Sequence, residues 1–401
     1  MTKSLPPEPS LKFLKLEAKS ILKAHRKKAP PACDVLRNLH KFADLSEKEI
    51  LAIPVNLQEV QYALAMEYGF KTWKELKDNV TKEEKKMVKF GNLKQELYNT
   101  TLMSVVKGVA DYFENPLSPA MLYGMSGHAF VINIHKSICP SSPYAWEHDR
   151  FFQLLKNVGI ATEHLGFFTE QNSAEGREAL EAKLRGELEE KLKKALDEKQ
   201  PCSFCNMEHQ IINGYDSKGL IFTLPWPNCE IGEDITPSRL DFGTWKQFKE
   251  VHACFFVHSK VEPVDEMQAL RECLQYAVDI FTKSSELSMG DYGMGTEAYK
   301  NWIAAAEKFG GEHGNWWNSM VWSECRKMAS EFFKELGAKY SQIADECNKL
   351  VTLYNDISVK LYETGDKEKT FEDKVILLQG AEKQELEAVE VIKQILSKLS
   401  V

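Results

Sequence analysis

His209 opens a predicted strand, and its imidazole is the side chain best suited to move a proton near neutral pH. Upstream, residues 118–135 (SPAMLYGMSGHAFVINIH) predict a helix that runs through a glycine-punctuated turn into a strand. A helix leading into a sheet, with a lone His on a later strand, is the layout of a thiol site. In such a site the helix N-terminus favours a thiolate and the His accepts the thiol proton. Residues 98–101 at the expected helix start read Tyr-Asn-Thr-Thr, so the Cys is missing.

Cys202, Cys205 and His209 are also close in the sequence, and their side chains are of the types that bind zinc. A structural zinc ion takes four such ligands, and no second pair at zinc-like spacing accompanies these three residues. We therefore predict no metal ion and no cofactor.

Glu385 stands in the apolar seam of a predicted helix. Leu378, Ala381, Ala388 and Ile392 repeat around it at steps of three and four. A carboxylate in such a seam needs a partner, because burying it alone is unfavourable. Two interpretations follow. In the structural one, Glu385 pairs with a Lys or Arg of a neighbouring helix or reaches solvent from a broad stripe. In the functional one, it is a ligand-binding carboxylate that faces the sheet-containing domain.

The composition is that of a globular protein with two or three domains. The 401 residues are 43% hydrophobic and 27% charged, and they exceed the usual size of one domain. The formal net charge of −8 argues against nucleic acid as a partner. No apolar run predicts a membrane span or a signal peptide, and nine scattered cysteines fit reduced thiols, so we expect a cytoplasmic protein.

The order of elements predicts an α+β fold flanked by helical parts. Residues 1–85 show short helical patterns, with a capping box at Ser46 and Glu49. In residues 86–262 we expect helices at 101–113, 146–158 and 173–199, and strands at 130–134, 202–207, 210–213, 220–224 and 251–257. Residues 263–401 are helical, and one seam comprises Ile343, Cys347, Leu350, Tyr354, Ile357 and Leu361.

The N-terminal part resembles a small helical module found at the front of some bacterial multidomain proteins, including ones with ankyrin repeats. The likeness rests on the segments LKLEAKSILKAHR, FADLSEKEIL and LAMEYGFKTWKELK within residues 8–80. These segments carry no catalytic motif, so the resemblance implies a docking or scaffolding role.

Residues 92–400 resemble the butirosin biosynthesis protein H family. In the first half the likeness rests on residues 101–112, on LSPAMLYG (117–124) and SGHAF (126–130), and on His209 ahead of Gly214-Tyr215-Asp216. In the helical half, residues 293–302 and 381–388 resemble the family. The likeness implies a papain-like domain related to the C39 peptidases, followed by a helical domain. The family's type member is similar to an acyltransferase that moves an acyl group from a carrier-protein thioester to an amine.

The resemblance also implies the catalytic residues. Thr101, or Thr100 beside it, falls at the nucleophile position, His209 at the base and Gln95 at the oxyanion donor. The third member, a carboxylate, is absent from the strand end after the His, which reads Leu-Pro-Trp, and Asn228 is the nearest substitute. The structural alternatives are a helix N-cap for Thr101, a structural role for His209 and a surface position for Gln95.

Ligand-binding residues are expected where the α+β domain meets the helical domain. Gly124, Gly127 and His128 from the former, with Trp302 and Glu385 from the latter, would line a cleft there. Because the Cys is missing, the favoured function is binding of a small molecule by a degenerate papain-like protein. The alternative is an acyl- or aminoacyl-group transferase, or an amide hydrolase, with an acyl carrier protein as partner.

Overall fold

The computed structural model describes residues 3, 5, 10–84, 87–169, 177–229, 235–245 and 252–399. The chain divides into two compact units. The first comprises Met1–Val88 with Tyr215–Gly219, and the second Lys89–Gly214 with Leu220–Val401. The predicted boundary at residues 85–86 lies beside this division, whereas the predicted boundary at 262–263 falls inside the second unit. The sheet and the C-terminal helices therefore belong to one compact unit.

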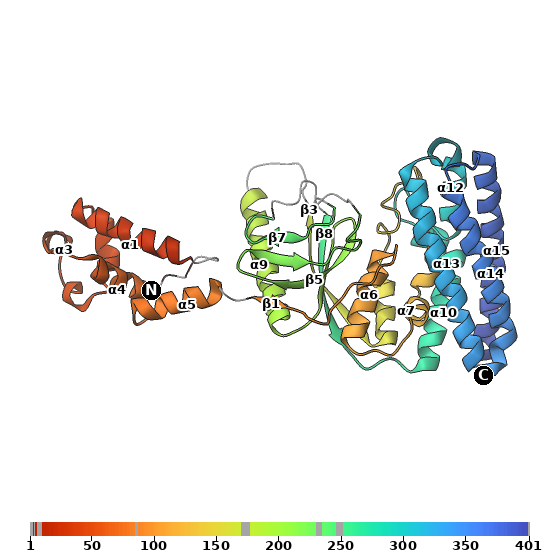
Figure 1. The fold of residues 1–401 in the computed structure, drawn as a ribbon, viewed down its shortest axis with the longest axis horizontal. Helices are drawn as coiled ribbons and strands as arrows, with labels where there is room; N and C mark the ends of the chain where they lie inside the picture. The colour runs from red at the N-terminus through yellow and green to blue at the C-terminus, as the bar shows by residue number, and fades with distance from the viewer. Residues whose placement is uncertain are drawn as a thin grey trace. The chain divides into compact units, whose positions relative to one another are not determined.

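The N-terminal unit is a helical module with its own apolar core (Figure 1). Its elements are α1 (Leu11–Arg26), α2 (Pro31–Leu36), η1 (His40–Phe42), α3 (Glu47–Ala52), α4 (Leu57–Glu67) and α5 (Trp73–Glu84). The predicted capping box is confirmed, because Ser46 accepts from the Glu49 N–H while the Glu49 carboxylate accepts from the Ser46 N–H. Leu14, Phe42 and Leu64 are fully buried in this core.

The second unit contains a seven-stranded sheet. Six strands follow the order β3 (Ile160–Thr169), β8 (His252–Lys260), β4 (Cys202–Cys205), β5 (His209–Tyr215), β6 (Gly219–Phe222) and β7 (Arg239–Asp241). The seventh, β1 (Val88–Lys89), pairs with β5. The β3–β8, β8–β4 and β4–β5 pairs are antiparallel. Mixed helix and antiparallel sheet agree with the predicted α+β class.

Two strand predictions differ from the structure for physical reasons. The sequence did not reveal β3, whose alternation is broken by a register shift between His164 and Gly166. The predicted strand at 130–134 is wrong for most of its length. Residues 128–130 form the 3-10 helix η2, and only β2 (Asn133–His135) is extended, antiparallel to β9 (Tyr292–Met294). Residues 130–134 are all buried, so neither face of the segment meets solvent.

Helices make up most of the rest of the second unit. They are α6 (Thr101–Tyr112), α7 (Pro119–Met125), α8 (Asp149–Leu154), η3 (Leu155–Val158), α9 (Arg177–Asp197), α10 (Glu266–Thr282), α11 (Ser284–Leu287), α12 (Thr296–Phe309), α13 (His313–Lys339), η4 (Ser341–Ile343), α14 (Ala344–Thr364) and α15 (Phe371–Leu399). The predicted helix at 146–158 is thus two shorter pieces, and the start of the one predicted at 173–199 lies outside the described residues. None of the helices within the described ranges is long and apolar enough to cross a bilayer.

The C-terminal helices pack as the seams predict. Figure 1 shows α13, α14 and α15 running alongside one another. All six residues of the predicted α14 seam are buried. Helix α13 also contacts α7 and η2, which belong to the predicted α+β domain. This contact joins the helices to the region that holds the candidate site.

Candidate functional site

The candidate site lies where α6 begins, beside the start of β5. Thr100 precedes the helix, and its side chain makes no capping hydrogen bond. Thr101 is the first helical residue and is fully buried. Its hydroxyl donates to Oε2 of Glu208 (2.7 Å) and accepts from the main-chain N–H of His209 (3.0 Å). The structure therefore brings Thr101 and His209 together, through the main chain of His209 rather than through its ring, and Thr101 is not a helix N-cap.

The His209 ring is buried among aromatic groups. Its centroid is 6.2 Å from that of Phe256 and 6.3 Å from that of Tyr144. Burial, reinforced by the nearby rings of other histidines, holds the pKa of His209 well below its ordinary value, so the ring is neutral. Its Nδ1 has no hydrogen-bond partner among the described residues, and the predicted substitute Asn228 is exposed. No described group therefore orients this ring as the third member of a triad would.

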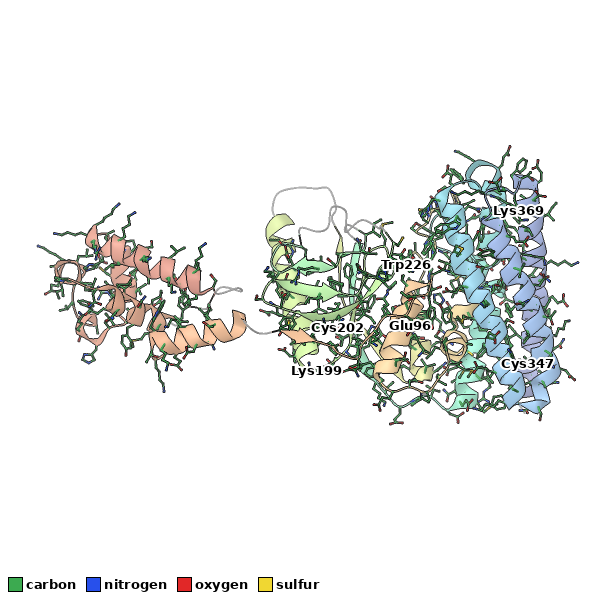
Figure 2. All side chains as sticks on the ribbon, viewed as in Figure 1. Glu96, Lys199, Cys202, Trp226, Cys347 and Lys369 are labelled. Atoms are coloured by element: carbon green, nitrogen blue, oxygen red, sulfur yellow. The ribbon has the colours of Figure 1, made fainter. Side chains whose placement is uncertain are left out.

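An indole occupies the strand end where the third member was expected. Trp226 donates its Nε1–H to the main-chain oxygen of Tyr98 (3.1 Å). Its ring meets that of Trp317 on α13 edge to face, with centroids 5.3 Å apart. Trp226 is labelled in Figure 2, at the junction of the sheet-containing part and the C-terminal helices. The position serves packing between these parts rather than orientation of an imidazole.

Gln95 uses both ends of its amide on the main chain of β5. Its Nε2 donates to the carbonyl of His209 (2.8 Å), and its Oε1 accepts from the N–H of Ile211 (2.9 Å). The side chain thus occupies β5 main-chain groups as a neighbouring strand would. The contacts that the structure shows for Gln95 are therefore structural ones to β5, and none of them supports the predicted oxyanion role.

Glu208 is a site residue that the sequence did not reveal. It is buried, and its Oε2 accepts hydrogen bonds from the hydroxyls of Thr101 and Tyr144. Burial raises the pKa of Glu208 to about 8, while the two hydrogen bonds oppose this rise. A glutamate in the short connection between two strands resembles a solvent-exposed turn residue, so only the three-dimensional contacts could identify it.

A second carboxylate, that of Glu324 on α13, occupies the N-terminus of α6. It accepts from the main-chain N–H groups of Asn99 (2.8 Å) and Thr100 (3.1 Å) and from the hydroxyl of Tyr123 (2.8 Å). Unpaired amides and the positive end of the helix dipole make such a position a natural anion site. In this protein the anion is supplied by the chain itself.

A thiol does lie near the start of α6, but on another helix. Cys325 Sγ is 3.6 Å from Nδ1 of His128 and 3.8 Å from Oγ1 of Thr100. Burial raises the pKa of Cys325 to about 12 and lowers that of His128 to about 3. The pair is therefore a neutral thiol beside a neutral imidazole, which is the opposite of an activated nucleophile.

The glycines predicted to bind a ligand are instead packing positions. A Cβ at Gly124 would overlap the Phe332 ring of α13, and one at Gly127 would lie 2.5 Å from the Tyr276 ring of α10. Gly127 also has a φ of +77°, which favours glycine. Both glycines let C-terminal helices approach η2 and α7, so the space beside them is filled by the chain and not by a ligand.

Trp302 and Glu385 are likewise satisfied within the protein. The fully buried Trp302 donates its indole N–H to Oδ1 of Asn315 (2.7 Å). Glu385 pairs with Nε of Arg326 (2.5 Å) and accepts from the hydroxyl of Tyr299 (3.1 Å). Of the two interpretations of Glu385, the structure shows the ion pair between helices. The five predicted ligand-binding residues thus lie in packed interior rather than around a cleft.

An open cavity occurs elsewhere at the same junction, and we call it the junction pocket. Its volume is about 570 Å³. It lies among the loop after α6, α7, the turn between η3 and β3, the chain after β8 and the end of α13. The lining residues are Phe113–Ser118, Met121, Met125, Asn157–Gly159, Lys260–Val264, Glu266, Glu335, Leu336 and Lys339. None of the five predicted ligand-binding residues lines it. The pocket nevertheless lies between the two parts where a ligand was expected.

Cys202 and Cys205 do not converge on one point. They are three residues apart on β4, so their side chains leave opposite faces of the strand. In the register, Cys205 lies opposite His209 and Cys202 opposite Ile212. Within the described part of the chain, no group of three or more His, Cys, Asp or Glu side chains is placed to hold a metal ion.

No protein-family model matches the chain, and no curated protein matches it. The likeness to the butirosin biosynthesis protein H family therefore rests on the residues and segments quoted above.

Proposed function

We propose that this chain is a binding protein on a degenerate papain-like, acyltransferase-type scaffold. In this proposal it has no working nucleophile and binds a small molecule in the junction pocket, between the α+β part and the C-terminal helices.

The occupied N-terminus of α6 is the observation that carries the proposal. In a thiol acyltransferase this end of the helix favours the thiolate. Here Glu324 takes the amides of Asn99 and Thr100, and its negative charge offsets the positive end of the helix dipole. An anionic nucleophile beside this carboxylate would be repelled rather than stabilised.

The hydroxyl at the nucleophile position is also committed. Thr101 is fully buried, and its oxygen is held by Glu208 and by the His209 main chain. An attack by this oxygen would require both hydrogen bonds to be rearranged and a substrate to reach a buried atom. The junction pocket, by contrast, is open, so a ligand can enter it without breaking either of these hydrogen bonds.

One contact favours the alternative of a hydroxyl-based transferase or amide hydrolase. Thr101 donates directly to Glu208, whose pKa of about 8 lies close to the value that suits a general base near neutral pH. In this version Glu208 takes the proton of Thr101 as the Thr101 oxygen attacks the acyl carbon, and it gives that proton to the departing thiol. His209 is then the base that takes a proton from the acceptor amine. The neutral state of Glu208 below pH 8 and the burial of Thr101 count against it.

A turnover assay distinguishes the two functions. Coenzyme A and acyl-carrier-protein thioesters are incubated with an amine acceptor, and release of the free thiol is followed. We expect the wild type to release no more thiol than its Thr101→Ala and His209→Ala variants. Release by the wild type that disappears in both variants would replace the binding function with the transferase.

A cysteine at position 101 tests the role of Glu324 directly. Thr101→Cys, in a Cys229→Ser background that removes an exposed thiol, should be alkylated slowly, because the site neither ionises nor exposes the thiol. Adding Glu324→Gln keeps the shape but removes the charge, and should raise the rate about threefold to tenfold. Rapid alkylation of Thr101→Cys with Glu324 intact, measured below neutral pH, would show that the N-terminus of α6 still activates a nucleophile.

A further inference from the structure

The junction pocket has an apolar floor. Met121, Met125, Val158 and Leu336 line it and are buried in the protein. Side chains of this kind favour an apolar ligand, because such a ligand is removed from water when it binds. The two methionines are unbranched and can adjust to its shape.

One buried polar atom of a pocket-lining residue lacks a partner among the described residues. Asn157 lines the pocket and is only 4% exposed. Its Nδ2 donates to the carbonyls of Met125 and Ala269 (3.4 Å each), which fixes the orientation of the amide. Its Oδ1 has no hydrogen-bond donor among the described residues. A buried acceptor without a donor is unfavourable, and a ligand with an O–H or N–H group would supply the missing donor.

The rim of the pocket is acidic. Four glutamates and two lysines line it. Lys339 pairs with Glu266, and Lys260 donates to the carbonyl of Phe113 (2.9 Å). The other three glutamates, Glu114, Glu262 and Glu335, are exposed and form no ion pair within the described residues. These carboxylates favour a cation over an anion at the mouth.

We propose that the junction pocket binds a small organic cation with an apolar body and a hydrogen-bond donor at the end opposite its ammonium group. The donor would reach Asn157 Oδ1 once the flexible Met121 and Met125 side chains shift, and the ammonium group would lie among Glu114, Glu262 and Glu335. This inference rests on the proposed binding function and names its class of ligand.

Three probes of matched size test the class. Tyramine carries a phenol and an ammonium group, phenethylamine lacks the phenol hydroxyl, and 3-(4-hydroxyphenyl)propionate replaces the ammonium by a carboxylate. Affinities are measured by titration calorimetry or ligand-observed NMR on the full chain at low salt. We expect tyramine to bind most tightly. Loss of the hydroxyl should weaken binding about twofold to tenfold, and the carboxylate probe should bind weakest.

Charge-removing variants assign the effect to the rim. Glu262→Gln combined with Glu335→Gln should weaken tyramine about threefold to tenfold and should not weaken the carboxylate probe. Glu331→Gln, on the same helix as Glu335 and outside the pocket, is the matched control and should change neither affinity. Leu117→Trp, or Val264→Trp if the first variant does not fold, fills the pocket and should abolish binding of all three probes.

Several outcomes would overturn the inference. A cationic ligand would be excluded if the propionate bound as tightly as tyramine, or if the double glutamine variant bound tyramine as tightly as the wild type. It would also be excluded if no probe bound. Tyramine binding that survives both tryptophan variants would place the ligand elsewhere. Failure of the binding proposal itself is seen separately, as turnover in the thioester assay, so the two failures are distinguishable.

Discussion

Two carboxyl groups flank the start of α6, and their hydrogen-bond partners differ in kind. Glu324 accepts from main-chain amides, which stabilise a charge. Glu208 is buried and bonded only to neutral hydroxyls, so burial dominates and its pKa rises to about 8. At neutral pH the Glu208 carboxyl is therefore mostly protonated.

The raised pKa of Glu208 predicts a pH-dependent stability. In the unfolded chain the carboxyl loses its proton near the ordinary value of 4.5, while in the folded protein it keeps the proton up to about pH 8. Folding takes up a proton between these values, so the free energy of unfolding falls as pH rises, by at most about 1.4 kcal/mol per pH unit. The Glu208→Gln variant has no carboxyl that titrates at this position, so its free energy of unfolding should lack this part of the pH dependence.

Urea unfolding of both proteins near pH 5 and near pH 8 measures the effect. The unfolding free energy of Glu208→Gln relative to wild type should increase with pH. Glu390→Gln removes an exposed carboxylate and serves as the control, with little expected change in slope. Parallel pH profiles for wild type and Glu208→Gln would mean that the Glu208 carboxyl is already ionised in the folded protein.

At the scale of elements, close approach of helices replaces the predicted ligand contacts. Gly124 lies in α7 under Phe332 of α13, and Gly186 lies in α9 with nothing within 4 Å of its would-be Cβ. Gly124→Ala should cost about 1–3 kcal/mol because the interface has no room for a methyl group. Gly186→Ala should instead stabilise the protein by about 0.5–1 kcal/mol, because the added methyl group meets no atom and reduces the conformational entropy of the unfolded chain. Thermal or urea unfolding compares the two, and equal effects would show that α7 and α13 are not in close contact.

The ion pair between α13 and α15 is another contact between elements. Glu385 and Arg326 are both fully buried, and Tyr299 adds a hydroxyl bond to the same carboxylate. Glu385→Gln leaves the Arg326 charge unpaired and should cost about 3–5 kcal/mol. Tyr299→Phe removes only a neutral hydrogen bond and should cost about 1 kcal/mol. A loss below 1 kcal/mol for Glu385→Gln in urea unfolding would show that the pair is reached by water.

At the scale of the whole molecule, the N-terminal module is a compact unit. It has a core of its own and forms a compact unit that ends at Val88, apart from residues 215–219. A chain that begins at Glu84 should therefore keep cooperative unfolding and bind tyramine within about twofold of the full chain. Circular dichroism melting and calorimetry check both properties. Insoluble or non-cooperative material would show that the second unit needs the module to fold.

The sequence by itself determined the features that depend on near neighbours. The α14 seam, the capping box at Ser46 and the α+β class follow from spacings of two, three and four residues, and the structure confirms them. The sequence does not predict the strand β3, because the register shift between His164 and Gly166 breaks the alternation of side chains that indicates a strand.

Only the tertiary structure decided what the site residues touch. Thr101 contacts Glu208 over a separation of 107 residues, and Thr100 contacts Glu324 over 224. Such contacts depend on how whole elements pack, and no local period records them. The sequence could therefore predict that Thr101 and His209 lie near each other. It could not predict that Glu208, just before β5, and Glu324, on α13, contact the N-terminus of α6, because those contacts depend on how β5 and α13 pack against that helix.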